Sequence, residues 1–505
     1  MDRAYSRPVL TCAAARAWEA GLLQDEAAEW GAMQQAGEAL SRAVVEDFKE
    51  IGGLPGNARI LVLAGKGHNG GDALLAARAL LRDHVAARAT VILAFGAGGL
   101  RPLAARALEW LERDAGARIK VVSATEALGP GTSYALCLDG IFGFQFRAPM
   151  DAATEGLLAA VNAHPAIALR AAVDLPSGVG ETSAAVAFRA DFTYATGILK
   201  EPVLAPTVAA AVGRLRYLDL GFFAASEPAE VNLRVLTPEI LAPLAALRPA
   251  QTDKRTFGHL FVVGGSWSYP GAVVLAVRAA LRSGVGLVTA FVPQRFAPEY
   301  AARHPEAMWV GCPETTAGGL APATVELVQS RLARANALLM GPGMSVEPEV
   351  LRTMEAIVRN TNIPLVLDAD ALRPEVVAHA KGRTFVGTPH AGELQRIMPA
   401  LFENDRFAAE NGVLVLKGPL TRVIDGKATY CSPSGGPVLA RGGSGDLLAG
   451  LIGGLLAQRR DDPLLAACRG VVWHGRAADF LARTHGQVAV EISEILEQLG
   501  PALLP

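Results

Sequence analysis

The run Gly442-Gly443-Ser444-Gly445-Asp446 combines residue types that can bind an anion and move a proton. Glycines let a backbone turn tightly and direct several N–H groups at one point. The apolar residues that follow predict a helix, whose N-terminus adds positive charge where a phosphate could sit. Because a carboxylate repels phosphate, Asp446 is better suited to take the proton from a hydroxyl that attacks phosphorus. The alternative is a glycine-rich turn in which Asp446 only caps the helix.

A second glycine-rich segment, residues 65–72, follows the apolar run 59–64. A strand, a glycine loop and a helix in this order are typical of nucleotide or phosphate sites. We expect the helix to begin at Ala73, so that His68, Asn69, Gly70, Gly71 and Asp72 form the loop. The spacing matches neither the dinucleotide fingerprint nor a P-loop.

Asp139 and Asp174 each follow a run of apolar residues, as expected at the carboxyl end of a buried strand. Either acid alone could simply cap the next helix. Together with Asn69 and Ser177, they would form an oxygen-rich pocket at one edge of a sheet. Hard cations with loose coordination, including monovalent ones, prefer such ligands.

The first half of the chain alternates strand and helix patterns. Two helices are expected within residues 11–49, and strands at 59–64, 90–94, 119–122, 134–140, 167–178, 192–196 and 215–220. This alternation predicts a doubly wound parallel sheet that binds ligands at the carboxyl ends of its strands.

The second half restarts with a strand at 259–263 and shows the same alternation. Strands at 337–340, 364–367, 384–387 and 413–416 each lead into Gly, Pro, acid, His or Lys residues. Such endings indicate a ligand cleft. Because residues 224–249 look irregular, we expect two α/β domains, 1–235 and 236–505.

Composition narrows the class of protein. The chain has 505 residues, which is too long for one ordinary core, and its net charge of −2 offers no electrostatic attraction to nucleic acid or an acidic membrane. Five scattered cysteines indicate reduced thiols. With no secretion signal or membrane-length apolar run in the sequence, we expect a cytoplasmic protein.

The motif order of the second half resembles the ribokinase-like superfamily. Within it, residues 254–258, Thr388-Pro389-His390-Ala391-Gly392-Glu393 and residues 440–450 look like the dehydratase of hydrated nicotinamide cofactors. The first half is similar to the NAD(P)H-hydrate epimerase family, in residues 33–37, 69–72, 139–143 and 174–178. The fusion of these two domains, epimerase first, is a known family arrangement. The resemblance implies a Rossmann-like three-layer domain followed by a ribokinase-like domain.

For the second half, the resemblance implies that Asp446 activates the hydrate's C6 hydroxyl, which attacks the terminal phosphate of ADP or ATP. Amides around Gly443, Ser444 and Gly445 would stabilise the developing charge. The expected nucleotide contacts also include Lys417, Gly418 and Thr421, with magnesium accompanying the nucleotide. The expected substrate contacts are Ala272, Gly343 and His390.

For the first half, the resemblance implies that Asp174 is the acid/base and that Asn69, Asp139 and Ser177 hold a potassium ion. Residues 68–72 and 143–149, which include Gly143, would line the hydrate's dinucleotide. The implied partners are the R and S hydrates of NADH and NADPH and ADP or ATP, without nucleic acid or membrane, in a homo-oligomer.

Several residues depart from the family pattern. His68 stands where an Asn is usual, Ala73 where a Gly is usual, and Phe144-Gln145-Phe146 replaces a Thr-Gly-Leu-like turn. Two other interpretations therefore stay open. One is a ribokinase-like kinase of another small molecule, and the other is a dehydratase whose first domain only binds nucleotides.

Overall fold

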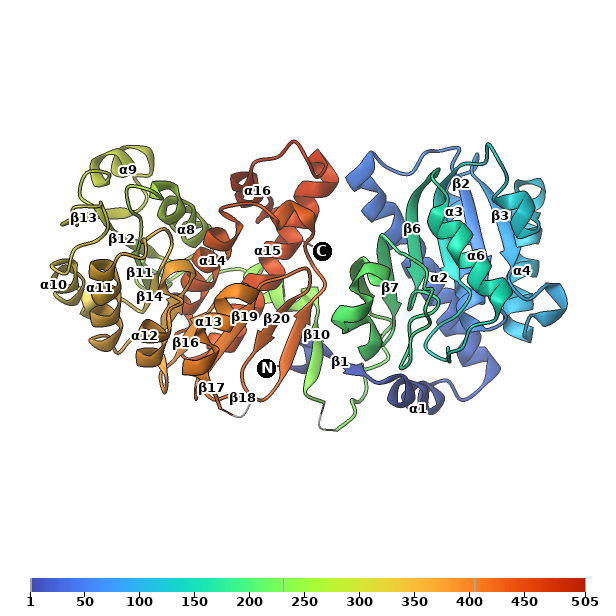
Figure 1. The fold of residues 1–505 in the computed structure, drawn as a ribbon, viewed down its shortest axis with the longest axis horizontal. Coiled ribbons are helices and arrows are strands. Elements are labelled where there is room, and N and C mark those ends of the chain that lie inside the picture. The colour runs from blue at the N-terminus through green and yellow to red at the C-terminus, as the bar shows by residue number, and fades with distance from the viewer. Residues whose placement is uncertain (1, 230, 404–405, 505) are drawn as a thin grey trace. The chain divides into compact units, whose positions relative to one another are not determined.

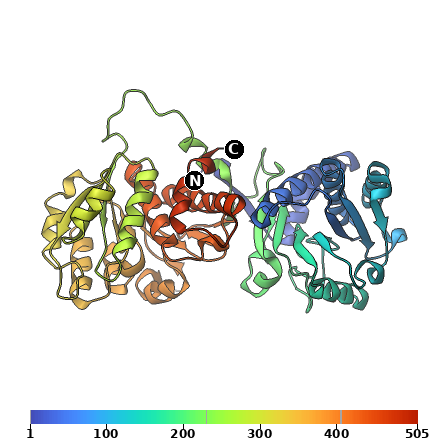
Figure 2. The same cartoon turned by 90° about the horizontal axis from the view of Figure 1, so that it is seen from above.

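The computed structural model describes residues 2–229, 231–403 and 406–504. The chain forms two compact units. The N-terminal unit contains Arg7–Val231 and Arg483–Gly486, and the C-terminal unit contains Met1–Ser6, Asn232–Ala482 and Gln487–Pro505. Each unit has helices on both sides of a largely parallel sheet (Figures 1 and 2), which confirms the predicted fold class.

The sheet of the N-terminal unit is entirely parallel, with the order β4-β3-β2-β5-β6-β7-β9. The strands are β2 (Arg59–Ala64), β3 (Arg88–Leu93), β4 (Ile119–Val121), β5 (Tyr134–Gly140), β6 (Ile167–Val173), β7 (Phe192–Thr196) and β9 (Arg214–Leu218). Separately, β1 (Ser6–Leu10) pairs in parallel with β8 (Leu199–Lys200).

Helices cover both faces of this sheet because its strands are apolar on both sides. In β2, Ile60 and Val62 belong to the core under α2–α4, whereas Leu61 and Leu63 belong to the core under α5 and α6. The helices are α1 (Cys12–Leu22), α2 (Glu26–Phe48), α3 (His68–Asp83), α4 (Pro102–Ala115), α5 (Ala124–Ala127), α6 (Ala152–Ala163) and α7 (Ala209–Val212).

In the C-terminal unit the strand order is β13-β12-β11-β14-β15-β16-β19-β20-β21-β10. The steps from β19 to β20 and from β20 to β21 are antiparallel, and the others are parallel. The strands are β10 (Leu233–Leu236), β11 (His259–Val263), β12 (Leu287–Pro293), β13 (Met308–Cys312), β14 (Ala337–Met340), β15 (Leu365–Leu367), β16 (Phe385–Gly387), β19 (Gly412–Leu416), β20 (Thr421–Ile424) and β21 (Thr429–Ser432), with a small hairpin of β17 (Phe402–Glu403) and β18 (Arg406–Phe407).

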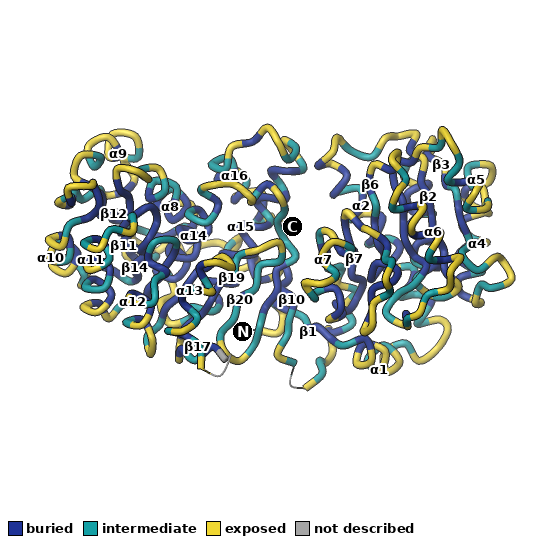
Figure 3. The backbone as a smooth tube through the Cα atoms, viewed as in Figure 1, coloured by how far each residue is buried: buried dark blue, intermediate teal, exposed yellow. Residues whose placement is uncertain are grey.

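Two cores flank this second sheet as well. Leu260 and Val262 of β11 pack with α8, α14 and α15, and Phe261 and Val263 pack on the other face, with α11. Figure 3 shows buried strands between helices with exposed outer sides. The helices are α8 (Pro270–Arg282), α9 (Ala297–Arg303), α10 (Thr324–Gln329), α11 (Pro348–Arg359), α12 (Pro374–Val377), α13 (Ala391–Leu401), α14 (Ser444–Gln458), α15 (Pro463–His485) and α16 (Ile495–Gln498).

Two local expectations from the sequence were wrong, and one element was missed. The helix expected from Ala73 begins at His68, so residues 68–72 form the first turn of α3 rather than a loop. The segment 224–249 is not wholly irregular, because it contains β10 and the 3₁₀ helix Pro238–Leu244. The hairpin of β20 and β21 was not expected, because it lacks the long apolar runs of the parallel strands.

Two further features concern the cysteines and the helices. All five cysteines are free and buried. Among the described helices, none has both the length and the apolar character that a membrane crossing requires.

Candidate active sites

In the N-terminal unit, Asp174 directly follows β6 and is 5% exposed. Its φ of 65° lies in the left-handed region, which is costly for a residue with a side chain. Strained backbone of this kind concentrates at functional sites, where the surroundings hold it in place. The geometry therefore sets Asp174 apart from an ordinary helix-capping acid.

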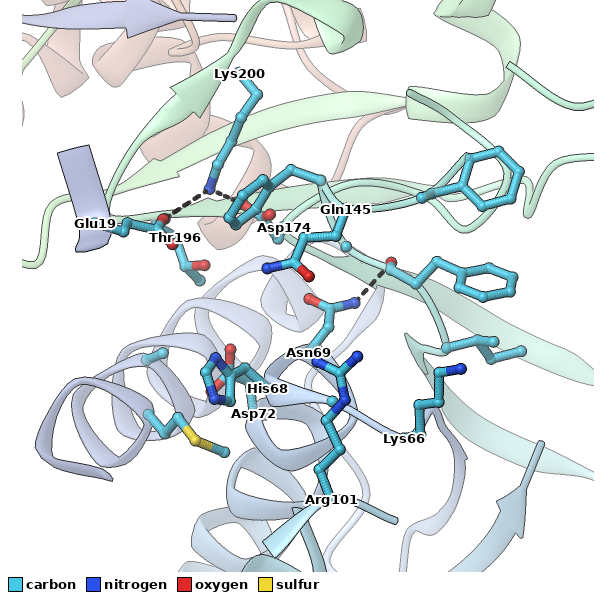
Figure 4. Close-up of a pocket in the computed structure, with 18 of the residues that line it drawn as sticks. Glu19, Lys66, His68, Asn69, Asp72, Arg101, Gln145, Asp174, Thr196 and Lys200 are labelled. Atoms are coloured by element: carbon cyan, nitrogen blue, oxygen red, sulfur yellow. Dashed lines mark hydrogen bonds and ion pairs between the residues drawn. The ribbon is translucent and has the colours of Figure 1, made fainter. Parts of the chain in front are cut away.

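Asp174 is paired with a lysine that the sequence reasoning missed. Lys200, at the end of β8 and 2% exposed, places its Nζ 2.6 Å from Asp174 Oδ1 and 3.8 Å from Glu19 Oε1 (Figure 4). Burial raises the pKa of Asp174, and the Lys200 ammonium opposes part of that rise. A charged residue after the apolar pair Ile198-Leu199 was the available signal, because a lysine buried in such a run requires an anionic partner.

The three predicted potassium ligands lie in one hydrogen-bonded network. Asp139 is fully buried and accepts hydrogen bonds from the Ser177 backbone N–H and hydroxyl, both at 2.7 Å. The Phe142 N–H donates to Ser177 Oγ at 2.9 Å, and Asn69 Nδ2 donates to Phe142 O at 2.8 Å. Burial raises the pKa of Asp139 to about 6, and its bonds from Ser177 oppose this rise.

The first turn of α3 approaches the sheet closely, and glycines make this approach possible. A Cβ on Gly140 would lie 2.6 Å from Asn69 O and 2.6 Å from Ala73 Cβ. A Cβ on Gly70 would lie 2.2 Å from Gly65 O. The predicted residues 68–72 are therefore held against the ends of β2 and β5, beside Asp139.

A cavity of about 540 Å³ opens over this region. Of the predicted residues, its walls include His68, Asn69, Asp72, Gly143 and Asp174; Gly70, Gly71, Asp139 and Ser177 are not among the lining residues. Lys200 and Glu19 also line it, and Figure 4 shows both with the predicted acids around one space. The cavity thus brings Glu19, Asp72 and Asp174 together with the ammonium group of Lys200.

The residues that depart from the family pattern also reach this cavity. Phe144, Gln145 and Phe146 line it, and the Phe144 ring centroid lies 4.8 Å from Lys200 Nζ. His68 places its Nε2 3.4 Å from Glu29 Oε2 and is half-exposed. The altered loop therefore contributes aromatic surface next to the buried ammonium group.

In the C-terminal unit, Asp446 lies in the first turn of α14, and Ser444 and Gly445 precede it in that turn. The N-cap is Gly443, whose φ of 92° suits glycine, and no side chain caps the helix. The Ser444 N–H donates to Arg441 O at 3.3 Å. Among the described residues, no N-cap side chain occupies the amides that follow it, as an anion site requires. Burial raises the pKa of Asp446 to about 7; the Asp368 carboxylate adds to the rise and Lys417 opposes it.

Lys417 lies between two acids beside this turn. Its Nζ is 3.0 Å from Asp368 Oδ1 and 3.8 Å from Glu393 Oε2. Asp368 is buried and accepts a 2.6 Å hydrogen bond from the Thr388 hydroxyl. A Cβ on Gly445 would lie 3.2 Å from Lys417 Nζ, so the predicted nucleotide residues Gly445 and Lys417 are adjacent.

His390 has a structural role in the described structure. Its Nδ1 accepts hydrogen bonds from the N–H groups of Gly392 and Glu393, at 3.0 and 3.3 Å, and so caps α13. The side chain is 59% exposed, and its Nε2 lies 3.5 Å from Glu393 Oε1. The cap orients the ring, which leaves Nε2 as the nitrogen for the predicted substrate contact.

The predicted substrate residues Ala272 and Gly343 are neighbours. A Cβ on Gly343 would lie 3.0 Å from Ala272 Cβ and 2.5 Å from Tyr269 O. A Cβ on Gly443 would lie 2.6 Å from Leu275 Cδ1, which places α8 beside the turn that carries Asp446. Gly418 has no other atom within 4 Å of its Cβ position, and Thr421 begins β20.

A second cavity, of about 450 Å³, lies in the C-terminal unit under residues 243–249. None of the predicted site residues lines it. The sequence reasoning also did not assign Asp368 to the site, although it noted that this acid follows a buried strand. Its direct contact with Lys417 is a tertiary feature, because the two residues are far apart in the sequence.

Comparisons with known proteins match both units. A family model described as NAD(P)H-hydrate dehydratase matches residues 260–500, and one described as YjeF-related protein N-terminus matches residues 31–201. A solved ADP/ATP-dependent NAD(P)H-hydrate dehydratase from Bacillus subtilis, co-crystallised with ATP and Mg²⁺, is 26% identical, with 53% of this chain and 96% of that chain covered and a TM-score of 0.43.

Three curated relatives, each named bifunctional NAD(P)H-hydrate repair enzyme Nnr, align with nearly the whole chain. The protein from Gloeobacter violaceus is 35% identical over 94% of this chain and 92% of its own length. The proteins from Moorella thermoacetica and Escherichia coli are 34% and 32% identical, over 92% and 87% of this chain and 91% and 84% of their own lengths.

Proposed function

Because the chain belongs to the family of bifunctional NAD(P)H-hydrate repair enzymes, we propose that it restores hydrated NADH and NADPH in two steps. The N-terminal unit interconverts the R and S hydrates. The C-terminal unit dehydrates the S form at the expense of ADP or ATP. One observation supports this proposal above the others. The same chain contains a cavity lined by Asp174 and, in its other unit, Asp446 in the first turn of a helix whose N-cap residue makes no side-chain hydrogen bond.

In the dehydration step, Asp446 accepts the proton of the C6 hydroxyl, whose oxygen then attacks the terminal phosphorus of the nucleotide. The amides of Gly443, Ser444 and Gly445 donate to the phosphoryl oxygens as negative charge builds up on them. The nucleotide leaves one phosphoryl group shorter. Phosphate then leaves C6, C5 loses a proton to solvent, and the C5=C6 double bond of the dihydronicotinamide ring forms. A pKa of about 7 suits this base, since it can both bind and release a proton near neutral pH.

Lys417 is suited to the nucleotide's phosphates, because its ammonium group lies next to Gly445. Gly418 and Thr421 complete the nucleotide contacts, and Ala272, Gly343 and His390 contact the hydrate. Magnesium accompanies the nucleotide and neutralises part of its charge. Dehydration rates with ADP and with ATP identify the preferred phosphoryl donor.

In the epimerisation step, Asp174 exchanges a proton with the substrate, and residues 68–72 and Gly143 bind its dinucleotide. Asn69, Asp139 and Ser177 fit a potassium ion, since all three carry side-chain oxygens. Asp139 and Ser177 bond each other directly, and Asn69 is linked to Ser177 through the Phe142 backbone. A monovalent cation held by these residues would supply fixed positive charge in the site. Asp139 and Ser177 hold the strand ends together through direct hydrogen bonds.

The test is to mix the protein with ADP or ATP, Mg²⁺ and S-hydrate, and to follow the return of absorbance at 340 nm. We expect recovery by the native protein and loss of about three orders of magnitude in kcat for Asp446→Asn, the middle of the range for a lost general base. If native protein gives no recovery and instead phosphorylates another alcohol, the kinase alternative is correct. Conversion of pure R-hydrate to S-hydrate, with and without K⁺, tests the N-terminal unit.

A homo-oligomeric state and a cytoplasmic location belong to the same proposal. The five free, buried cysteines support a reducing compartment. Light scattering of the full chain will give its oligomeric state.

A further inference from the structure

Epimerisation at C6 requires a proton donor as well as a proton acceptor. The C6 hydroxyl is a poor leaving group until it is protonated, and the incoming water must lose a proton. One carboxyl group in a single protonation state cannot do both at once. The carboxyl groups that line the cavity of the N-terminal unit include Glu19, Asp72 and Asp174, and these can divide the two roles.

Lys200 lies closer to Asp174 than to Glu19. Its Nζ donates to Asp174 Oδ1 at 2.6 Å and to Thr196 O at 3.4 Å, and it lies 3.8 Å from Glu19 Oε1. The pKa of Lys200 is raised: burial opposes its charge, but Asp174 and Glu19 outweigh burial. The single ammonium group therefore stabilises one anion best, and the direct bond selects Asp174.

Asp72 has the opposite surroundings. It lies on α3 and lines the same cavity, and its buried Oδ1 has no hydrogen-bond partner among the described residues. Burial raises the pKa of Asp72 well above the usual value, and the negative charges of Asp174 and Glu19 raise it further. The Lys200 ammonium group lowers this pKa, but its effect is the smallest of the four. A carboxyl group without a cation partner in such a place keeps its proton.

We propose that Asp72 is the proton donor of the epimerase and that Lys200 is the positioning residue that makes Asp174 the acceptor. Asp72 protonates the C6 hydroxyl, the C6–O bond breaks, and water leaves while the N1 lone pair forms an N1=C6 double bond. Water then adds to the other face of C6, its O–H proton passes to Asp174, and the N1=C6 electron pair returns to N1. Exchange with solvent returns the proton from Asp174 to Asp72. This inference depends on the proposed epimerase function.

The other titratable groups that face Lys200 do not replace these roles. Glu19, on α1, has its pKa raised to about 7 by burial, but it lies farther from Lys200 than Asp174 does. Cys12, also on α1, has its pKa raised to about 12 by burial and by Glu181, so it stays a neutral thiol. Glu181 accepts the Cys12 N–H at 2.7 Å.

The first experiment measures the conversion of pure R-hydrate to S-hydrate by the full chain between pH 5.5 and 9. Asp72→Asn keeps the shape but has no acidic proton, so we expect kcat to fall at least about 100-fold, the lower end for a lost general acid, with KM changed little. A kcat within threefold of the native value would overturn the assignment of Asp72. Dehydration of S-hydrate by the same preparation shows that the chain is folded.

The second experiment compares Lys200→Met with Lys200→Arg. Because Asp174 must be ionised to accept a proton, kcat should fall as the pH is lowered. Loss of the Lys200 ammonium group should raise the pH at which this fall occurs by more than about one unit. Arginine keeps the charge and should restore the native limb. Lys49→Met, at an exposed lysine of the same unit, is the matched control.

The outcomes separate this inference from the function on which it rests. If native protein does not interconvert the hydrates, the proposed epimerase function is wrong. If it does, and Lys200→Met keeps the native acid limb, the role of Lys200 is wrong. If Lys200→Met does not fold, Lys200→Arg provides the test. A shift of the acid side of its pH profile away from the native position would contradict the role of Lys200. The activity of Asp72→Asn still tests whether Asp72 is the proton donor.

Discussion

Asp446 differs from an ordinary surface aspartate because a buried acid and a lysine flank it. Burial and Asp368 raise its pKa to about 7, and Lys417 opposes the rise. The base must be ionised to work, so kcat/KM for dehydration of S-hydrate should increase with pH and level off above about 7. Initial rates at low hydrate concentration, with saturating nucleotide, measure this profile.

Lys417→Met tests the cause of that pKa. Removing the ammonium group removes the effect that lowers the pKa of Asp446. The rise of kcat/KM with pH should therefore occur at higher pH. KM for the nucleotide should increase as well. Lys427→Met changes an exposed lysine in the turn before β21 and should leave both quantities unchanged. If kcat/KM of Lys417→Met rises at the same pH as that of the native protein, Lys417 does not control the pKa of Asp446.

At the scale of elements, a buried ion pair fastens α2 to the edge strand β9. Asp47 Oδ1 lies 2.9 Å from Arg216 Nη2, and the two residues are 1% and 9% exposed. Arg483 also reaches Asp47, at 2.8 Å. Burial opposes ionisation of Asp47, but the two arginines outweigh it and lower its pKa.

Asp47→Asn should therefore destabilise α2 and β9 by about 3 kcal/mol, the lower end for breaking a buried pair. Hydrogen exchange of peptides from these elements should accelerate about 100-fold. The pKa of Asp47 is lower in the folded protein than in the unfolded chain. The stabilisation by its ion pairs is therefore present above the unfolded-state pKa and is lost as the pH falls through the folded-state pKa. The difference between native and variant should thus shrink in acid.

The control for this prediction also lies on α2. Glu38 pairs with Arg82 at a site where the side chains are 35% and 52% exposed. Glu38→Gln should change stability by less than about 1 kcal/mol, since water already screens this pair. Equal effects of Asp47→Asn and Glu38→Gln would mean that the buried pair does not hold α2 to β9.

For the whole molecule, each unit has its own predicted catalytic set, with Asp174 in one and Asp446 in the other. We therefore expect Asp446→Asn to epimerise at the native rate and Asp174→Asn to dehydrate pure S-hydrate at the native rate. Mixing the two variants should convert R-hydrate to NADH, because the S-hydrate can pass through solution. A defect of more than about twofold in the unmutated unit would show coupling between the sites.

Much of this architecture could be predicted from short runs of sequence. The strands at 59–64 and 134–140, and a helix after Gly443, follow from local apolar patterns, and they place Asp139 and Asp446 at sheet edges or helix starts. The start of α3 was placed too late, at Ala73 rather than His68. Asn and Gly have low helix propensity, but packing against β2 and β5 holds Asn69, Gly70 and Gly71 in the first turn of α3.

The sequence by itself determined the order of strands, glycine turns and acids, because those patterns depend on neighbours along the chain. Only the tertiary structure decided that Lys200 bonds Asp174 and that Lys417 bonds Asp368. It also decided that Asp72 has a buried oxygen with no partner in the described part of the chain. Burial and charge at these positions come from residues distant in sequence. The protonation states that the chemistry needs therefore depend on the folded chain.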